Sequence, residues 1–135
     1  MNDVVQKLSP WPFAQTLACL TKAIADAQMT LFAKIDHAAG ARAIGIVIPA
    51  TTLLIYGHAR AGTPALIESP LAALDLPLRV LVREEGGQVL VAIHPVGAVL
   101  ANAGVSRASA EGIEPGQHIV FAALDPRAHL AGNQG

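Results

Sequence analysis

Residues 76–94, LPLRVLVREEGGQVLVAIH, decide the fold, because two runs rich in Val, Leu and Ile flank a pair of glycines. Gly86 and Gly87 can adopt the positive φ angles that a tight turn between strands needs. The stretch therefore predicts a β-hairpin with strands at 78–84 and 88–94. A hairpin of this kind places an antiparallel sheet at the centre of the fold.

Two more strands precede the hairpin. The first is MTLFAKIDH (29–37), where alternation predicts a strand with Met29, Leu31, Ala33 and Ile35 on one face and Thr30, Phe32, Lys34 and Asp36 on the other. The second, TTLLIYG (51–57), is a continuous apolar run, typical of a buried strand. Between them, residues 37–50 are rich enough in alanine for one or two helical turns that end at Gly45. Residues 3–8 give a weaker strand signal.

Helical spacing is clearest in residues 12–28, where Phe13, Leu17, Leu20 and Ile24 form one apolar stripe. A short helix is expected to open at Pro64, after Thr63 as its N-cap, and another at Pro95 that ends at Gly104. The order is strand, helix, four strands with the short helix before the third of them, and a closing helix. This order predicts an α+β fold: an antiparallel sheet with helices on one face.

Residues 1–104 are expected to form a single α+β domain. Residues 105–135 change in character and are expected to be an appendage that packs on the core or on a partner chain. Within it we expect a turn at 114–116, one further strand at 118–124 and a helix that begins at Asp125 and Pro126. The last few residues are expected to be loose.

Composition restricts the class of protein. Of the 135 residues, 53% are hydrophobic and 14% charged, whereas about 25% are charged in typical soluble domains. So few charges cannot cover the surface evenly, which predicts burial of apolar surface in a homodimer. The nine basic and ten acidic residues are scattered singly, which argues against nucleic acid and against an anionic membrane as partners.

The single cysteine, Cys19, excludes an internal disulfide and any zinc site built from several cysteines. No uncharged apolar run reaches the roughly 18 residues that span a bilayer, and the N-terminus lacks a signal-peptide pattern. We expect a cytoplasmic protein without a cofactor. Cys19 itself is interpreted as a small core or flanking residue, with a nucleophile as the alternative.

Four short stretches together resemble a known family. They are Asp36 and His37, the threonine pair Thr51 and Thr52 with Gly57 at the end of the same strand, Gly62-Thr63-Pro64, and residues 74–78, LDLPL. Over residues 12–103 the chain resembles the family called domain of unknown function number 302. The resemblance implies a TATA-binding-protein-like β-α-β4-α order, a dimer, and no established activity.

The chain departs from the family pattern at several positions. His58 and Ala59 stand where the family usually has Asn-Pro, and Ala65 and Leu66 replace its Leu-Met. The proline before the paired threonines is displaced to Pro49, and an aromatic residue usual near the end of the hairpin is missing. A family site that needs that asparagine or that ring is altered here.

If the four strands pair in sequence order, alternate strand ends meet at the same rim of the sheet. One rim then carries His58, the loop 60–64, Asp75 and His94, and the other carries Asp36, His37, Thr51 and the turn 85–88. The candidate ligand-binding residues are Asp36, His37, Thr51, Thr52, Gly57, His58, Arg60, Gly62, Thr63, Asp75 and His94.

The first rim has the chemistry of an anion site, because a helix that opens at Pro64 would offer unpaired N–H groups to a carboxylate or phosphate. The alternative is that Thr63 and Pro64 only cap and start the helix. His58 and His94 would be two metal ligands if their side chains could meet, but one strand separates their backbones by roughly 10 Å. With no third ligand at a recognisable spacing, we predict no metal.

Asp36 and His37 suggest an acid/base pair, since a carboxylate can orient an imidazole. Adjacent strand residues point to opposite faces, however, so Asp36 is equally explained as a helix N-cap. Three functions stay open: a module that binds a small anionic or polar ligand at loop 57–64, an enzyme that uses His37 or His58 as acid/base, and an assembly protein without a small-molecule site.

Overall fold

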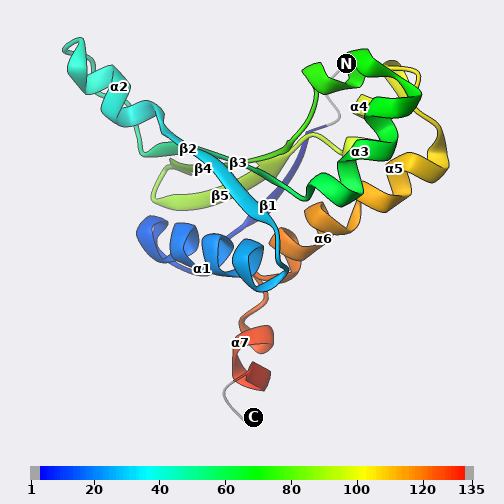
Figure 1. Cartoon of the computed structure of the whole chain (residues 1–135). Helices are drawn as coiled ribbons and strands as arrows, with labels where there is room; N and C mark the ends of the chain where they lie inside the picture. The colour runs from blue at the N-terminus through cyan, green and yellow to red at the C-terminus, as the bar shows by residue number, and fades with distance from the viewer. Residues whose placement is uncertain (1–3, 133–135) are drawn as a thin grey trace.

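The centre of the fold is a five-stranded antiparallel sheet. In the computed structural model, which describes residues 4–132, the strands lie in the order β1-β5-β4-β3-β2. Their bounds are Val5–Leu8 (β1), Thr30–Asp36 (β2), Thr51–Gly57 (β3), Leu78–Glu85 (β4) and Gln88–Ile93 (β5). The expected α+β fold with pairing in sequence order is confirmed, and the weak first strand becomes the edge beside β5 (Figure 1).

The hairpin forms as its sequence indicated. Glu85 pairs with Gln88, and the two residues between them, Gly86 and Gly87, have φ angles of 57° and 80°. Both angles lie in the left-handed region that glycine reaches at no steric cost. Local backbone chemistry therefore sets the register of β5 with β4, the central strand of the sheet.

Seven α-helices and one 3-10 helix accompany the sheet within the described residues. They are α1 Phe13–Asp26, α2 His37–Ala43, α3 Ala59–Glu68, η1 Pro70–Leu74, α4 Val96–Asn102, α5 Arg107–Ile113, α6 Pro115–Ala122 and α7 Pro126–Gly132. Helices α1 and α6 contact each other and lie on one side of the sheet, whereas α3, α4 and α5 gather beside it (Figure 1). None of the described helices is long and apolar enough to cross a membrane.

The core lies between the sheet and α1 with α6. Tyr56 is fully buried in it, and its hydroxyl donates a 2.9 Å hydrogen bond to the carbonyl oxygen of Gly116. Residues of the 105–124 segment, among them Val120 and Leu124, belong to the same buried cluster as Leu20 of α1. The C-terminal segment thus packs on the core, although the expectation of loose final residues, 133–135, lies outside the described residues.

Strand β2 contains a β-bulge that the alternating sequence concealed. Leu31 pairs with Tyr56 and Ala33 pairs with Ile55, so the register shifts between Leu31 and Ala33. Residues paired directly across strands share a face, and Tyr56 and Ile55 face opposite sides of the sheet. The prediction of a common face for Leu31, Ala33 and Ile35 was therefore wrong, because Phe32 is the inserted residue of the bulge.

Two other local predictions were wrong. The helix expected to open at Pro64 begins at Ala59, so Pro64 lies inside α3. The strand and turn expected at 114–124 form a helix instead, with Pro115 in the first turn of α6. Pro64 is accommodated inside α3, whereas Pro115 stands in the first turn of α6, a position where proline is common. The run 118–124 was assigned to a strand because a short apolar run does not distinguish a strand from a helix.

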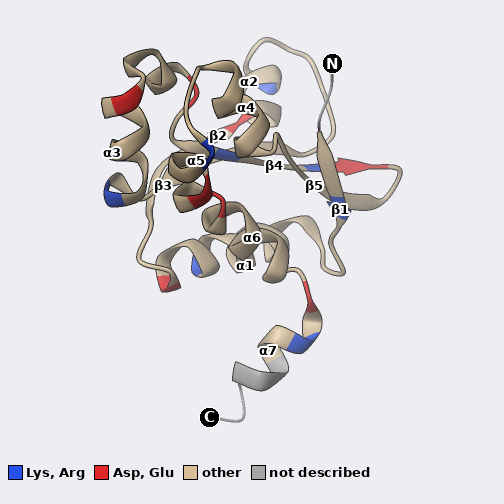
Figure 2. Cartoon of the chain, turned by 90° about the vertical axis from the view of Figure 1, so that its right-hand side faces the viewer, with Lys and Arg blue, Asp and Glu red and all other residues tan. Residues whose placement is uncertain are grey.

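An arm, residues 37–50, projects beyond the sheet between β2 and β3 (Figure 1). Gly45 ends its helical part with a φ of 82°, as expected. Its tip exposes large aliphatic side chains, with Ile44 at 74% and Val47 at 87% of full accessibility. The described charged residues are dispersed along the ribbon, and the tan arm carries few of them (Figure 2). Ala38 at the base of the arm is buried, so it is the tip of the arm that forms an exposed apolar projection.

Candidate functional site

One pocket of about 380 Å³ opens at the rim where β3 ends and β4 begins. Four segments far apart in sequence surround it: the start of β2, the pocket-facing side of α3, the η1–β4 connection, and the α5–α6 corner. The lining residues are Ala27, Met29, Phe32, Gly57, His58, Ala59, Ala61, Gly62, Thr63, Leu66, Ala73, Leu76, Pro77, Leu78, Gly112, Ile113, Pro115, Gly116 and Ile119.

The pocket wall is apolar except at one place. No charged residue lines it, and His58 and Thr63 are its two polar side chains. The Thr63 hydroxyl donates to the carbonyl oxygen of Ala59 at 2.7 Å and so satisfies its own donor within α3. A mostly apolar wall with few polar groups is the usual make-up of a small-molecule site.

His58 presents one free hydrogen-bond donor at this pocket. It is the N-cap of α3, where its Nδ1 accepts a 3.1 Å hydrogen bond from the backbone N–H of Arg60. An acceptor Nδ1 places the proton of the neutral imidazole on Nε2. His58 lines the pocket, and its Nε2 makes no hydrogen bond within the described residues. His58 is the capping residue that sequence analysis had assigned to Thr63.

The floor of the pocket depends on two glycines that allow close contact. A Cβ at Gly57 would lie 3.2 Å from Cβ of Pro77, and one at Gly116 would lie 2.6 Å from Cδ1 of Leu78. Real Cβ atoms do not approach a neighbour as closely as the second distance. The contact at Gly116 brings the α5–α6 corner against the start of β4, and both segments line the pocket.

The α3 and α5 walls are joined by one carboxylate. Glu68, the last residue of α3, accepts hydrogen bonds from the hydroxyls of Ser109 and Ser106, at 2.8 and 2.9 Å, and from the backbone N–H of Ser106. Ser106 is the N-cap of α5. Hydrogen bonds from Ser109 and then Ser106 lower the pKa of Glu68, so the carboxylate stays charged at the positive end of α5.

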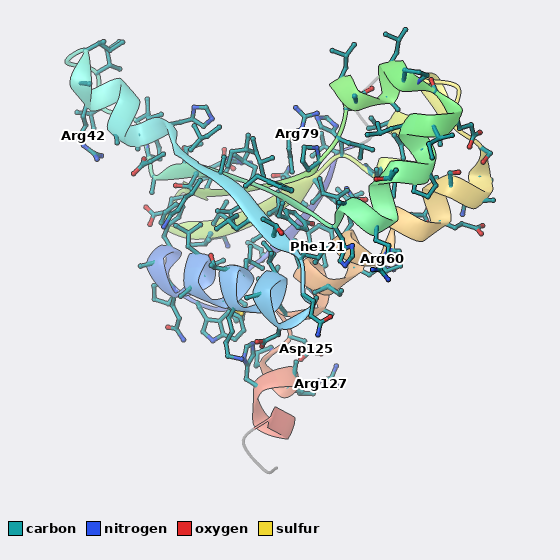
Figure 3. The ribbon with its side chains drawn as sticks, viewed as in Figure 1. Arg42, Arg60, Arg79, Phe121, Asp125 and Arg127 are labelled. Atoms are coloured by element: carbon teal, nitrogen blue, oxygen red, sulfur yellow. The ribbon has the colours of Figure 1, made fainter. Side chains whose placement is uncertain are left out.

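His94 and Asp75 share the rim with His58 but not its pocket. They line a separate hollow of about 30 Å³ with Arg79 and Gln117, on the other side of Pro77 and Leu78. Gln117 is 5% exposed, donates to the carbonyl oxygen of His94 at 2.7 Å and accepts from the N–H of Val96 at 2.8 Å. It caps the first turn of α4. Arg60 and Arg79 both extend away from the ribbon (Figure 3).

The candidate residues at the opposite rim line neither of these two hollows. The Asp36 carboxylate accepts from the N–H of Ala39 at 2.9 Å, so Asp36 is the N-cap of α2. His37 is exposed at the start of that helix, and the Thr51 hydroxyl donates to the carbonyl oxygen of Pro49. Thr52, paired with Asp36, is buried. The structure therefore does not bring His37 and His58 together. His37 follows the end of β2 and His58 follows the end of β3, and because these strands are antiparallel their ends lie at opposite rims of the sheet.

Cys19 lies away from both rims, on α1. Its Sγ is 3.2 Å from the carbonyl oxygen of Ala123 and 3.3 Å from Nε2 of His129. Burial raises the pKa of the Cys19 thiol, and the nearby Lys22 charge only partly opposes this. A raised pKa disfavours the thiolate that a nucleophile needs. Within residues 4–132, no three His, Cys, Asp or Glu side chains gather as metal ligands would.

Most of the pocket wall was not predicted from the sequence. Met29, Leu76 and the α5–α6 corner carried no site signal, because apolar residues at such positions are indistinguishable from core. Phe32 did carry a signal: the alternation placed this aromatic ring on the polar face of its strand. An aromatic residue out of phase with its strand indicates a bulge or a contact, and here it lines the pocket.

Three curated relatives share part of the sequence. The "Fluoride-specific ion channel FluC 1" of Brucella suis is 37% identical over 67 residues, which are 49% of this chain and 26% of the relative. The protein of the same name from Brucella abortus has the same identity over 25% of its length. This chain therefore spans about a quarter of each of these relatives.

A solved structure and a family model agree on the fold. A crystal structure of an uncharacterized conserved DUF302 protein from Bacillus stearothermophilus superposes with a TM-score of 0.78 at 14% identity, covering 90% of this chain and 95% of that one. The family model, described as "Domain of unknown function DUF302", matches residues 5–131. With five antiparallel strands in the expected order and a family match over nearly its whole length, this chain belongs to the DUF302 family, whose function is unknown.

Proposed function

We propose that this chain is a binding module that takes one small, mostly apolar ligand into the 380 Å³ pocket and holds the ligand's polar end at His58. One observation carries the proposal: a mostly apolar wall includes His58, whose Nε2 makes no hydrogen bond within the described residues. The polar end can be a neutral carbonyl or an anion, since the free donor requires only an acceptor. The volume lies within the range of known ligand sites.

The proposed site differs from the anion site expected at Pro64. Pro64 lies inside α3, which begins at Ala59, so no helix N-terminus with unpaired N–H groups exists there. The proposed site keeps four of the residues predicted from the sequence: Gly57, Gly62 and Thr63 belong to its wall, and His58 is its hydrogen-bond donor. His94 and Asp75 belong to the smaller hollow and are not part of it.

The pocket can be filled without disturbing the core. Gly62 lies in α3, and a Cβ there has its first neighbour, Cδ1 of Leu76, at 4.0 Å, so Gly62→Leu places a side chain in the cavity. Gly40 in α2 meets nothing within 4 Å, which makes Gly40→Leu a matched control far from the pocket. Both changes also remove a helical glycine, so their effects on helix propensity are similar.

The test measures binding of 8-anilinonaphthalene-1-sulfonate, a dye with apolar aromatic rings and an anionic sulfonate, by fluorescence titration. We expect saturable one-site binding by the native chain and by Gly40→Leu, and at least tenfold weaker binding by Gly62→Leu. His58→Gln, which removes the ring donor, should weaken binding less than Gly62→Leu. Equal binding by all four proteins would place the dye elsewhere and refute the proposal.

We also propose that the chain forms a homodimer. The arm exposes Ile44 and Val47, and the face of the sheet away from α1 leaves Leu8 and Ile35 exposed. Large apolar surfaces of this kind are usually covered by another chain. Sedimentation equilibrium should give twice the chain mass for the native protein and the chain mass for Val47→Glu; a native monomer at micromolar concentration would contradict the dimer.

The single free Cys19 suits a cytoplasmic location, which we propose on that ground.

A second candidate function follows from the curated relatives. Because a quarter of each Brucella fluoride channel resembles this chain, we infer that a domain of this kind can act as an accessory unit of such a channel. Liposomes containing the Brucella suis channel without its matched segment provide the assay. Addition of this chain should change the fluoride efflux rate at least twofold relative to added serum albumin, and an unchanged rate would exclude this function.

A further inference from the structure

The β-bulge in β2 brings an aromatic ring to the proposed pocket. Phe32 is the extra residue between Leu31 and Ala33, and a bulge changes the direction of the side chain it carries. The Phe32 ring lines the pocket, and its Cε2 is 3.9 Å from where a Cβ of Gly57 would stand. The edge of the ring therefore lies close to the bare backbone at the end of β3.

Phe32 differs from the other aromatic residues of the chain. Tyr56 is buried, and Trp11, Phe13 and Phe121 are partly buried against the core, whereas Phe32 is 56% exposed. A single exposed apolar side chain needs no explanation by itself. Here, however, the exposed ring is also the one aromatic side chain in the wall of the pocket.

The neighbours of Phe32 favour a flat occupant. Gly57 carries no side chain beside the ring, and Pro77 lies against Gly57. Met29 adds a polarisable thioether to the same wall, and such a sulfur makes favourable contacts with aromatic rings. The His58 donor lines the same pocket. A planar group can thus contact the Phe32 ring while an acceptor attached to it meets His58.

We infer that the pocket selects a planar aromatic or heteroaromatic ring that carries one hydrogen-bond acceptor, with Phe32 as the specificity-determining residue. This inference rests on the proposed binding function and names the chemical class of its ligand. Aromatic pairs are more favourable than their buried area alone explains. That advantage corresponds to about a twofold to tenfold preference over a saturated ligand of the same skeleton.

The experiment compares 2-acetylnaphthalene with its fully saturated decalin analogue, because both ketones offer the same acceptor on the same carbon skeleton. Dissociation constants are measured by isothermal titration for the native chain, Phe32→Leu and Phe121→Leu. Phe121→Leu is the matched control, since Phe121 packs against the core and does not line the pocket.

We expect the native chain and Phe121→Leu to prefer the aromatic ketone by twofold to tenfold, and Phe32→Leu to bind both ketones equally. Equal binding of the two ketones by the native chain overturns the inference and leaves the binding function intact. A preference that persists in Phe32→Leu also overturns it, as does failure to bind either ketone by a chain that still binds the anilinonaphthalene dye in its pocket. If Gly62→Leu leaves dye binding unchanged, the proposed function itself fails.

Discussion

The two rims of the sheet carried similar signals in the sequence but have different structures. At the first, Gly57, His58 and Gly62 line a cavity that three other segments complete. At the second, Asp36 caps a helix and His37 is exposed beside a projecting arm. Both rims offered a histidine and small polar residues. The difference teaches that polar side chains at the end of a strand are not enough to form a small-molecule site. An apolar pocket wall must surround them as well.

The first rim depends on a close contact that the second rim lacks. Gly116→Val should destabilise the fold by about 1–3 kcal/mol, because the new Cβ would overlap Cδ1 of Leu78 and crowd Sδ of Met29. Gly112→Val is the control, since Gly112 is also helical and meets nothing within 4 Å. Urea unfolding would measure both. An equal loss of stability in the two variants would show that the change of a helical glycine to valine, rather than the contact at Gly116, causes the destabilisation.

The second rim is predicted to be structural. Asp36→Ala removes the acceptor for the N–H of Ala39 and should destabilise the chain by about 1 kcal/mol, while dye binding stays unchanged. Asp36→Asn should restore most of the stability, because its side-chain oxygen can still cap. Thermal unfolding and the fluorescence titration together check this. Weaker dye binding by Asp36→Ala would break the distinction between the rims.

A smaller effect is expected at the α3–α5 connection of the first rim. The pKa of Glu68 is lower in the folded chain than its ordinary value of 4.5. A carboxylate of this kind stabilises the fold above its unfolded pKa, and the contribution is lost as pH falls through the folded pKa. Because Glu68 is exposed, the contribution is modest.

The melting temperature of Glu68→Gln should therefore lie below that of the native chain at pH 6, and the difference should shrink as pH falls below about 4.5. Glu111→Gln is a suitable control, because Glu111 pairs with Arg107 within α5 and does not join the two helices. A difference that is constant from pH 6 to pH 3 would mean that the charge on Glu68 does not contribute.

The smallest effect is expected at His37. Its ring is exposed and lines neither hollow, so His37→Ala should change stability by no more than about 0.5 kcal/mol and leave dye binding intact. The same measurements on His58→Ala should show weaker binding. If His37→Ala and His58→Ala weakened binding equally, the second rim would contribute to the site, for example across a dimer.

The parts of the fold that the sequence predicted correctly depend on neighbouring residues. Gly86 and Gly87 fix a turn by their own backbone freedom, the stripe of Leu17, Leu20 and Ile24 fixes the buried face of α1, and alternating or continuous apolar runs locate the strands. The family resemblance rested on similarly short stretches. The cap at Asp36 was also predictable, since capping depends on a residue three positions away.

Only the tertiary structure decided where the pocket lies. The pocket collects residues from Ala27 to Ile119, and no local pattern distinguishes an apolar pocket wall from an apolar core. The true start of α3 at Ala59 and the direction of Phe32 were likewise set by contacts with distant segments, which outweigh local propensity. The sequence by itself determined the five strands and helix α1, because turns and periodicity act over a few residues. The enclosed volume was decided by packing, which joins residues nearly a hundred positions apart.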